Sequence, residues 1–90
     1  VERQIHEYIA LKNMSIKEVQ YKLLSKGISK DNIDNYIYNN REELLEYELN
    51  SAKQIMIKKE NILEKDKIIE YLRKKGYMQE TIKIISLGDN

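Results

Sequence analysis

Apolar residues recur at intervals of three and four along most of the chain, a spacing that places them on one face of an α-helix. In the stretch SIKEVQYKLLSKG this face consists of Ile16, Val19 and Leu23. Ser15 and Glu18 form a capping-box pair at the start, because each side chain can bond to the backbone amide of the other residue. Gly27 then supplies the left-handed conformation that commonly ends a helix. The pattern predicts a helix over residues 16–26.

The same periodicity predicts helices along the rest of the chain, so the predicted fold class is all-α. They cover about residues 1–12, 30–39, 41–59, 64–75 and 79–87. Glu48 lies inside the apolar stripe of its helix, and we expect its carboxylate to reach the edge of the core or to pair with a lysine. Met78 stands where a capping Ser or Asp would precede the last helix, so we expect that helix to fray.

Two stretches of the chain, KLLSKGIS and YLRKKGYM, carry leucine, lysine and glycine in the same order 49 residues apart. Superposing Gly27 on Gly76 pairs the apolar positions around them: Val19 with Ile68, Leu23 with Leu72, Ile28 with Tyr77, Ile33 with Ile82 and Tyr36 with Ile85. Such a recurrence is typical of helical arrays whose small units bury their cores against one another. We predict two tandem three-helix repeats, over residues 1–40 and 41–90.

The chain has 90 residues, of which 34% are charged and 41% are hydrophobic. This length allows one small domain, without the volume to enclose a large active site. No apolar run approaches the roughly 18 residues of a membrane span, and the absence of Cys fits a reducing compartment. The sequence begins at Val1 without a positively charged, apolar leader, which indicates a piece of a longer protein rather than a secreted one. We expect a cytoplasmic protein.

The residue types that most catalytic and metal sites need are missing. His6 is the only histidine and there is no cysteine, so no Cys–His pair or His-rich metal site can form. The acidic stretch REELLEYE lacks calcium-loop spacing and is better explained as a solvated helix start. The three glycines, Gly27, Gly76 and Gly88, form no phosphate-binding loop. We expect no enzymatic activity, metal or cofactor.

The net charge of +1 hides an uneven distribution. Residues 12–30 carry +4, residues 31–51 carry −5 and residues 58–75 carry +3. Basic blocks of this kind favour contact with phosphates or with an acidic protein surface. The candidate partner-binding or DNA-binding residues are Lys22, Lys26, Lys58, Lys59, Arg73, Lys74, Lys75 and Tyr21. A solvated helix face is the alternative for each lysine, and lysines near helix ends also favour the helix dipole.

The seven tyrosines fall into different environments on the predicted helices. Tyr36 and Tyr77 occupy core-type positions, where we expect packing. Tyr21 projects opposite the apolar stripe of its helix, where it could stack on a base or fill a partner's pocket. Packing of Tyr21 against the neighbouring repeat is equally consistent with the pattern.

Three stretches of the sequence resemble the RecX family, regulators of the RecA recombinase. KEVQYKLLSKGISKDNI is similar to the family's I-x-x-E-L-x-x-K-G-I-x-x-x-x-I pattern, and KIIEYLRKKGYMQETI to its later L-x-x-K/R-G-F-x-x-x-x-I pattern. Between them, ELNSAKQIMIKKE resembles the family's alanine followed by a lysine pair, here Ala52, Lys58 and Lys59. The resemblance extends over about residues 5–87, with the order and spacing of the three stretches preserved.

The resemblance implies tandem three-helix repeats in an elongated, curved monomer that lies along the groove of a RecA filament. RecX-like proteins modulate, and usually inhibit, the RecA ATPase and strand exchange in recombination, DNA repair and the SOS response, without catalysing a reaction. Several of them also bind DNA, so single- or double-stranded DNA is a further expected partner. The family usually has one more N-terminal repeat, and this chain therefore corresponds to its second and third repeats.

Two other classes of function remain open on the sequence. One is a small helical DNA-binding protein with a basic patch and no RecA partner, for which affinity should fall steeply with salt. The other is a structural adaptor for protein interactions, which should not respond to DNA.

Overall fold

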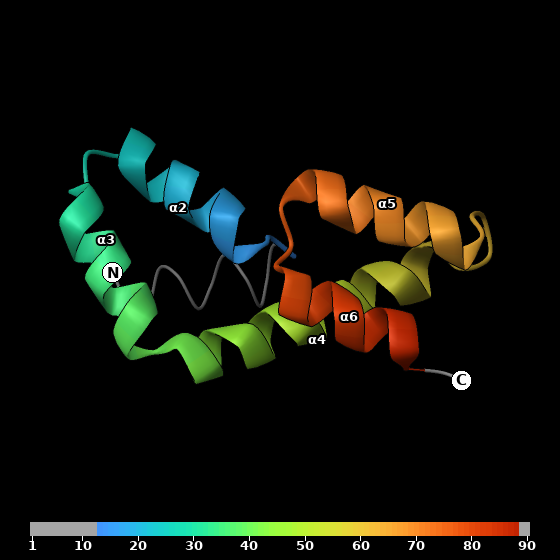
Figure 1. Ribbon diagram of the computed structural model, residues 1–90. Coiled ribbons are helices and arrows are strands. Elements are labelled where there is room, and N and C mark those ends of the chain that lie inside the picture. The colour runs from blue at the N-terminus through green and yellow to red at the C-terminus, as the bar shows by residue number, and fades with distance from the viewer. Residues whose placement is uncertain (1–12, 89–90) are drawn as a thin grey trace.

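The computed structural model describes residues 13–88, and every regular element in this part of the chain is an α-helix (Figure 1). The helices are α2 (Ile16–Ser25), α3 (Lys30–Asn39), α4 (Arg41–Lys59), α5 (Lys65–Lys75) and α6 (Gln79–Leu87). This confirms the all-α fold class, and the predicted bounds differ from the observed ones by at most one residue. The helix predicted for residues 1–12 lies outside the described residues. No helix between residues 13 and 88 has the length and apolar character needed to cross a membrane.

The two helices of the repeated sequence, α2 and α5, end in the same way. Gly27 and Gly76 both have a left-handed backbone, with φ angles of 91° and 93°. In each case the amide of the next residue bonds to the carbonyl four positions before the glycine, at 3.2 Å for Ile28 and 3.1 Å for Tyr77. Glycine adopts this backbone without the steric cost that a side chain adds. The recurring glycine therefore ends both helices where the sequence predicted, while the division into two three-helix repeats stays a prediction.

The long helix α4 contributes to two groups of buried side chains. The first group joins α2 and α3 to the first half of α4 and consists of Ile16, Val19, Leu23, Ile33 and Leu44. The second group joins α5 and α6 to the second half of α4 and consists of Ala52, Ile55, Ile68, Leu72, Tyr77, Ile82 and Ile85. Tyr36 packs against the first group, so both tyrosines predicted to pack in the core do so.

The arrangement of the helices makes the molecule elongated, with extents of 38 × 22 × 18 Å. At 1.5 Å per residue, the 19 residues of α4 span about 28 Å, which is long enough to pass under both groups. Along the opposite side, the end of α5 meets the beginning of α2 (Figure 1). Ser15, which precedes α2, donates a hydrogen bond from its hydroxyl to the Lys75 carbonyl at 2.9 Å. The ends of two helices 60 residues apart in sequence are thus joined directly.

Glu48, in the middle of α4, binds the beginnings of two other helices. Its side chain is fully buried, and one carboxylate oxygen accepts the Ile16 amide at 2.8 Å. The other oxygen accepts the Met78 amide at 3.0 Å and the Thr81 hydroxyl at 2.5 Å. The negative carboxylate also matches the positive ends of the α2 and α6 dipoles. The prediction that Glu48 reaches the edge of the core or pairs with a lysine is therefore wrong, because helix amides satisfy this carboxylate.

The same carboxylate replaces the cap that α6 lacks in its own sequence. Met78, the residue before α6, makes no capping hydrogen bond with its side chain. Its amide and the hydroxyl of Thr81 instead reach Glu48 of α4. The expectation that α6 frays rested on a missing local cap, and a tertiary contact removes that reason.

Candidate functional site

A hollow of about 290 Å³ lies where the end of α4 meets the second half of α5. It is lined by Asn13, Ile55, Lys58, Lys59, Ile62, Tyr71 and Lys75. Three of these residues, Lys58, Lys59 and Lys75, were predicted from the sequence to bind a partner. The structure therefore brings part of the predicted basic set together around a single aromatic ring.

The packing of α4 against α5 determines where these three lysines lie. Ile55 of α4 and Leu72 of α5 are buried in the same group of side chains. Lys58 and Lys59 follow Ile55 by three and four residues, and Lys75 follows Leu72 by three, so each lies one helical turn beyond a buried residue. Packing of the two apolar side chains brings the three lysines to the same part of the surface. The carboxyl ends of both helices also favour positive charge.

Tyr71 lies between the lysines, with its residue 36% exposed. The Lys59 ammonium is 4.5 Å from the centre of the Tyr71 ring, and the Lys75 ammonium is 5.8 Å from it. At such distances the electron-rich face of the ring attracts a cation. Ile55 and Ile62 add apolar surface to the hollow. The site thus combines positive charge, an aromatic ring and an apolar wall.

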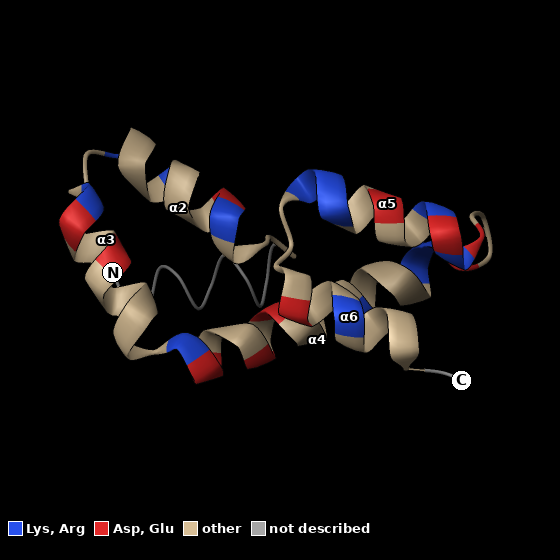
Figure 2. Cartoon of the chain, viewed as in Figure 1, with Lys and Arg blue, Asp and Glu red and all other residues tan. Residues whose placement is uncertain are grey.

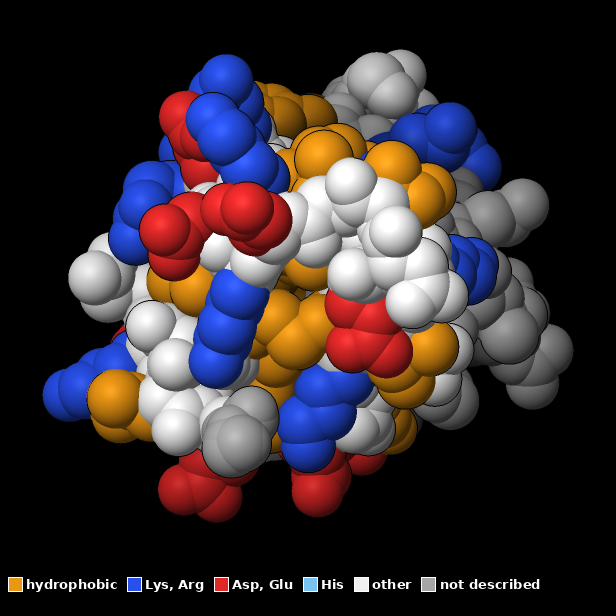
Figure 3. Space-filling view, turned by 90° about the vertical axis from the view of Figure 1, so that its right-hand side faces the viewer, with side chains coloured by type: hydrophobic (Ala, Val, Ile, Leu, Met, Phe, Trp, Pro, Cys, Tyr) orange, Lys and Arg blue, Asp and Glu red, His pale blue; other side chains and the backbone are white. Residues whose placement is uncertain are grey.

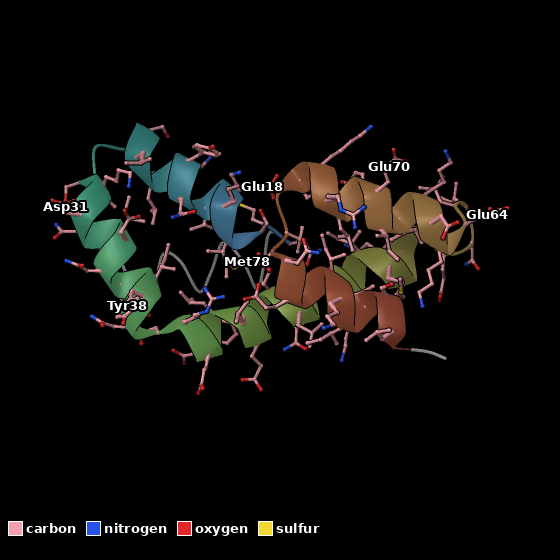
Figure 4. The ribbon with its side chains drawn as sticks, viewed as in Figure 1. Glu18, Asp31, Tyr38, Glu64, Glu70 and Met78 are labelled. Atoms are coloured by element: carbon pink, nitrogen blue, oxygen red, sulfur yellow. The ribbon has the colours of Figure 1, made fainter. Side chains whose placement is uncertain are left out.

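Lys75 differs from the other two lysines because it has an acidic partner. Its ammonium lies 3.1 Å from a carboxylate oxygen of Glu18, and both side chains are more than two-thirds buried. Glu18 extends from the beginning of α2 towards the end of α5 (Figure 4). Lys75 therefore helps to hold α2 against α5, and Glu18 offsets part of the charge that Lys75 brings to the hollow.

Lys58 and Lys59 carry the positive charge that remains available. Lys58 is exposed and Lys59 is half-buried. Within residues 13–88, neither lysine forms an ion pair with a carboxylate. An anion that enters the hollow would therefore meet two ammonium groups that no acidic side chain of the described residues neutralises.

The other predicted basic residues lie outside the hollow. Arg73 and Lys74 are exposed on α5, close to it in sequence, and Figure 2 shows basic residues at the end of this helix. Lys22 and Lys26 are exposed near the end of α2. Lys26 follows Ser15 by eleven residues, so it lies about 16 Å along the helix from the junction with α5. The basic residues in the last turns of α4 and α5 are called the α4–α5 basic group: Lys58, Lys59, Arg73, Lys74 and Lys75.

Tyr21, the aromatic candidate from the sequence, lies in a different hollow between α2 and α3. It is 62% exposed and shares this hollow with Lys17, Lys30 and Asp34. The Asp34 carboxylate lies 2.6 Å from the Lys30 ammonium and raises the pKa of Lys30 through a hydrogen bond and its charge. Lys30 is thus already paired, and the Asp34 carboxylate itself lines the hollow, so Lys17 is the one lysine there without an ion pair among the described residues. This hollow is therefore less suited to an anion than the one beside Tyr71, where two such lysines lie.

Sequence reasoning missed Tyr71. One signal was present, since Tyr71 and Lys75 are four residues apart and therefore neighbours on a helix surface. The approach of Lys59 to the same ring depends on how α4 packs against α5, which no local pattern encodes.

An apolar surface lies at the end of the molecule that carries the α4–α5 turn and the end of α6. Ile62, Ile84 and Leu87 are exposed by 79%, 49% and 77%. Figure 3 views this end and shows hydrophobic side chains among acidic and basic ones. Scattered exposed apolar residues are common on soluble proteins, so these three identify no ligand by themselves.

Between residues 13 and 88, no group of three His, Asp or Glu side chains is placed to hold a metal ion.

The chain matches no protein-family model, no curated protein and no solved structure. The hollow offers ammonium groups to an anion and a ring face to a planar group.

Proposed function

We propose that this protein is a RecX-like regulator that binds the RecA–DNA filament and lowers its ATPase and strand-exchange activity. The observation that carries the proposal is the repeated glycine stretch, which has the RecX-like pattern around both Gly27 and Gly76. Both glycines have the left-handed backbone for which glycine is the favoured residue. The RecX-like alanine and lysine pair lies between them in α4, with Ala52 buried and Lys58 and Lys59 in its last turn.

The proposed mechanism is steric and electrostatic. An elongated helical molecule with the α4–α5 basic group and two further lysines at the end of α2 suits a groove bordered by phosphates or acidic side chains. By occupying that groove as a monomer, the protein would hinder subunit exchange or the entry of duplex DNA. Such a regulator acts in the cytoplasm, where the recombinase filament forms on DNA.

A second candidate is a DNA-binding protein without a RecA partner. The hollow beside Tyr71 favours it, because Lys58 and Lys59 form no ion pair with a carboxylate of residues 13–88 and lie beside an aromatic ring. Such a surface can bind nucleic acid without any protein component. A structural adaptor is the third class, and it requires binding to neither DNA nor the filament.

Co-sedimentation separates these three classes. The chain is mixed with RecA filaments preformed on single-stranded DNA, and in parallel with the same DNA without RecA, at near-physiological salt. Pelleting with the filament alone supports the regulator, and inhibition of the RecA ATPase by the same preparation is then expected. Equal pelleting with bare DNA supports the second candidate, whereas pelleting with neither contradicts both binding proposals.

Matched variants test whether the basic surface is responsible. The double variant Arg73→Glu and Lys74→Glu reverses two exposed charges of the α4–α5 basic group and should reduce pelleting with the filament. The double variant Lys53→Glu and Lys83→Glu makes the same change in net charge at exposed positions of α4 and α6. Equal loss in the two variants would show that only the net charge matters, which contradicts a role for this surface.

A further inference from the structure

The hollow beside Tyr71 has a more specific chemistry than a general basic surface. We propose that it binds one unpaired nucleotide of a single-stranded nucleic acid, with phosphates on Lys58 and Lys59 and the base against Tyr71 and Ile62. This inference rests on the proposed function and deepens it, because it assigns the DNA contact to one site and one form of DNA.

The charge of the site supports a phosphate ligand. Lys58 and Lys59 are adjacent in the last turn of α4 and form no ion pair with a carboxylate within residues 13–88. Adjacent phosphates of a nucleic acid strand present negative charges that two such ammonium groups can contact, with release of bound counterions. Lys75 contributes less, because Glu18 already lies 3.1 Å from its ammonium.

The aromatic ring supports an adjacent base. A base can stack on Tyr71 because every base has a flat π-face. Among residues 13–88, the Tyr71 ring is the only partner of the Lys59 ammonium, which lies 4.5 Å from the ring centre. Attraction between a half-buried cation and a ring is still weaker than a charge-assisted bond to a phosphate. When a strand enters, Lys59 can therefore turn to a phosphate and leave the ring face to the base.

The combination of lysines, an aromatic ring and an apolar side chain favours a single strand over duplex DNA or an acidic protein surface. In a duplex the bases are paired and stacked on each other, so none is free to enter a hollow beside Tyr71. An acidic protein surface would satisfy the lysines but leaves the ring and the exposed Ile62 without a planar partner. An unpaired nucleotide supplies both the anion and the flat apolar surface.

Fluorescence anisotropy with labelled oligo(dT) tests this proposal directly, with the same oligonucleotide annealed to oligo(dA) as the duplex competitor. The variant Lys58→Gln removes one cation from the site, and each cation lost should reduce the slope of log affinity against log salt by about 0.7. The matched variant Lys83→Gln removes one exposed cation from α6 and should leave the slope unchanged. The variant Tyr71→Leu should weaken binding about fivefold or more, whereas Tyr71→Phe keeps the ring and should bind like the wild type.

The outcomes separate this site from the regulatory role. Loss of oligo(dT) affinity in Lys58→Gln and Tyr71→Leu, with both variants retaining the wild-type circular dichroism spectrum and melting curve, supports the site even if filament pelleting fails. Wild-type affinity in both variants overturns the site, while filament pelleting can still support the regulator. Equal binding of duplex and oligo(dT), or no binding of oligo(dT) by the wild type, also overturns it.

Discussion

The carboxylate of Glu48 should be among the most important polar groups for stability, and the variant Glu48→Gln tests this. The substitution keeps the size and shape of the side chain but replaces one acceptor oxygen with an NH₂ donor. In the native protein the two oxygens of Glu48 face the amide of Ile16 on one side and the amide of Met78 on the other. In either orientation of the glutamine, a donor faces one of these amides, so one buried N–H loses its acceptor.

The size of the effect follows from two contributions. A buried donor left without a partner costs about 1–3 kcal/mol. Loss of the negative charge removes a favourable interaction with the N-terminal dipoles of α2 and α6, each worth about 0.3–1 kcal/mol. The Thr81 hydroxyl can rotate to accept from the new NH₂ group, so it adds little to the loss. We expect Glu48→Gln to lower the free energy of unfolding by about 2–5 kcal/mol, a large part of the roughly 5–15 kcal/mol typical of small domains.

Urea unfolding followed by circular dichroism measures this difference, provided that the m-value, the slope of the free energy of unfolding against urea concentration, is the same in wild type and variant. The control is Glu46→Gln, the same chemical change on the exposed side of α4, which should alter the free energy of unfolding by less than about 0.5 kcal/mol. If Glu48→Gln is as stable as Glu46→Gln, then the buried carboxylate does not hold α2 and α6 in place. A stability loss in both variants would instead indicate a general effect of charge on α4.

Two further predictions concern the backbone and the pH dependence of stability. Gly27→Ala should lower the free energy of unfolding by about 1 kcal/mol, because alanine is strained at a φ of 91°. Gly76→Ala should lower it further, because a new Cβ there would lie 3.2 Å from Cβ and Cδ of Lys17. Equal losses of stability in urea unfolding would contradict this difference. Burial raises the pKa of the Tyr77 hydroxyl despite its hydrogen bond with Ser51. The contribution of Tyr77 to the free energy of unfolding is therefore fully present below about pH 10, the pKa of an unfolded tyrosine, and is lost as the pH rises further. The free energy of unfolding should then fall by up to about 1.4 kcal/mol per pH unit. Tyr77→Phe should lack this decline, and an identical alkaline loss in wild type and variant would show that other groups cause it.

The helices were predictable because their signals are local. The capping box of Ser15 and Glu18 is formed as the sequence indicated, with the Ser15 hydroxyl accepting the Glu18 amide at 3.1 Å. The glycines at the ends of α2 and α5 have the backbone that their place after an apolar stripe predicts. Such features depend on residues within one or two helical turns, so a single sequence contains the information needed to find them.

The contacts between helices were predicted less well because they depend on partners far away in the chain. Glu48 was expected to reach the edge of the core or to pair with a lysine, since a buried carboxylate usually requires water or a positive partner. The amides at the beginnings of α2 and α6 satisfy it, and these lie 32 and 30 residues away. The hollow beside Tyr71 shows the same limit. Its lysines were predicted individually from composition and helix geometry, but their common ring follows from the packing of α4 on α5.

The junction between α5 and α2 determines which lysine can report on binding. Lys75 contributes an ammonium to the hollow, but it also pairs with Glu18, and its carbonyl accepts the Ser15 hydroxyl. Removing its side chain would therefore change the contact between the helices as well as the charge of the site, so a loss of binding would have two explanations. Lys58 is exposed and has no ion pair within the described residues. Its substitution alters the charge presented to a ligand without altering the junction, and for this reason Lys58 is the better probe of what the hollow binds.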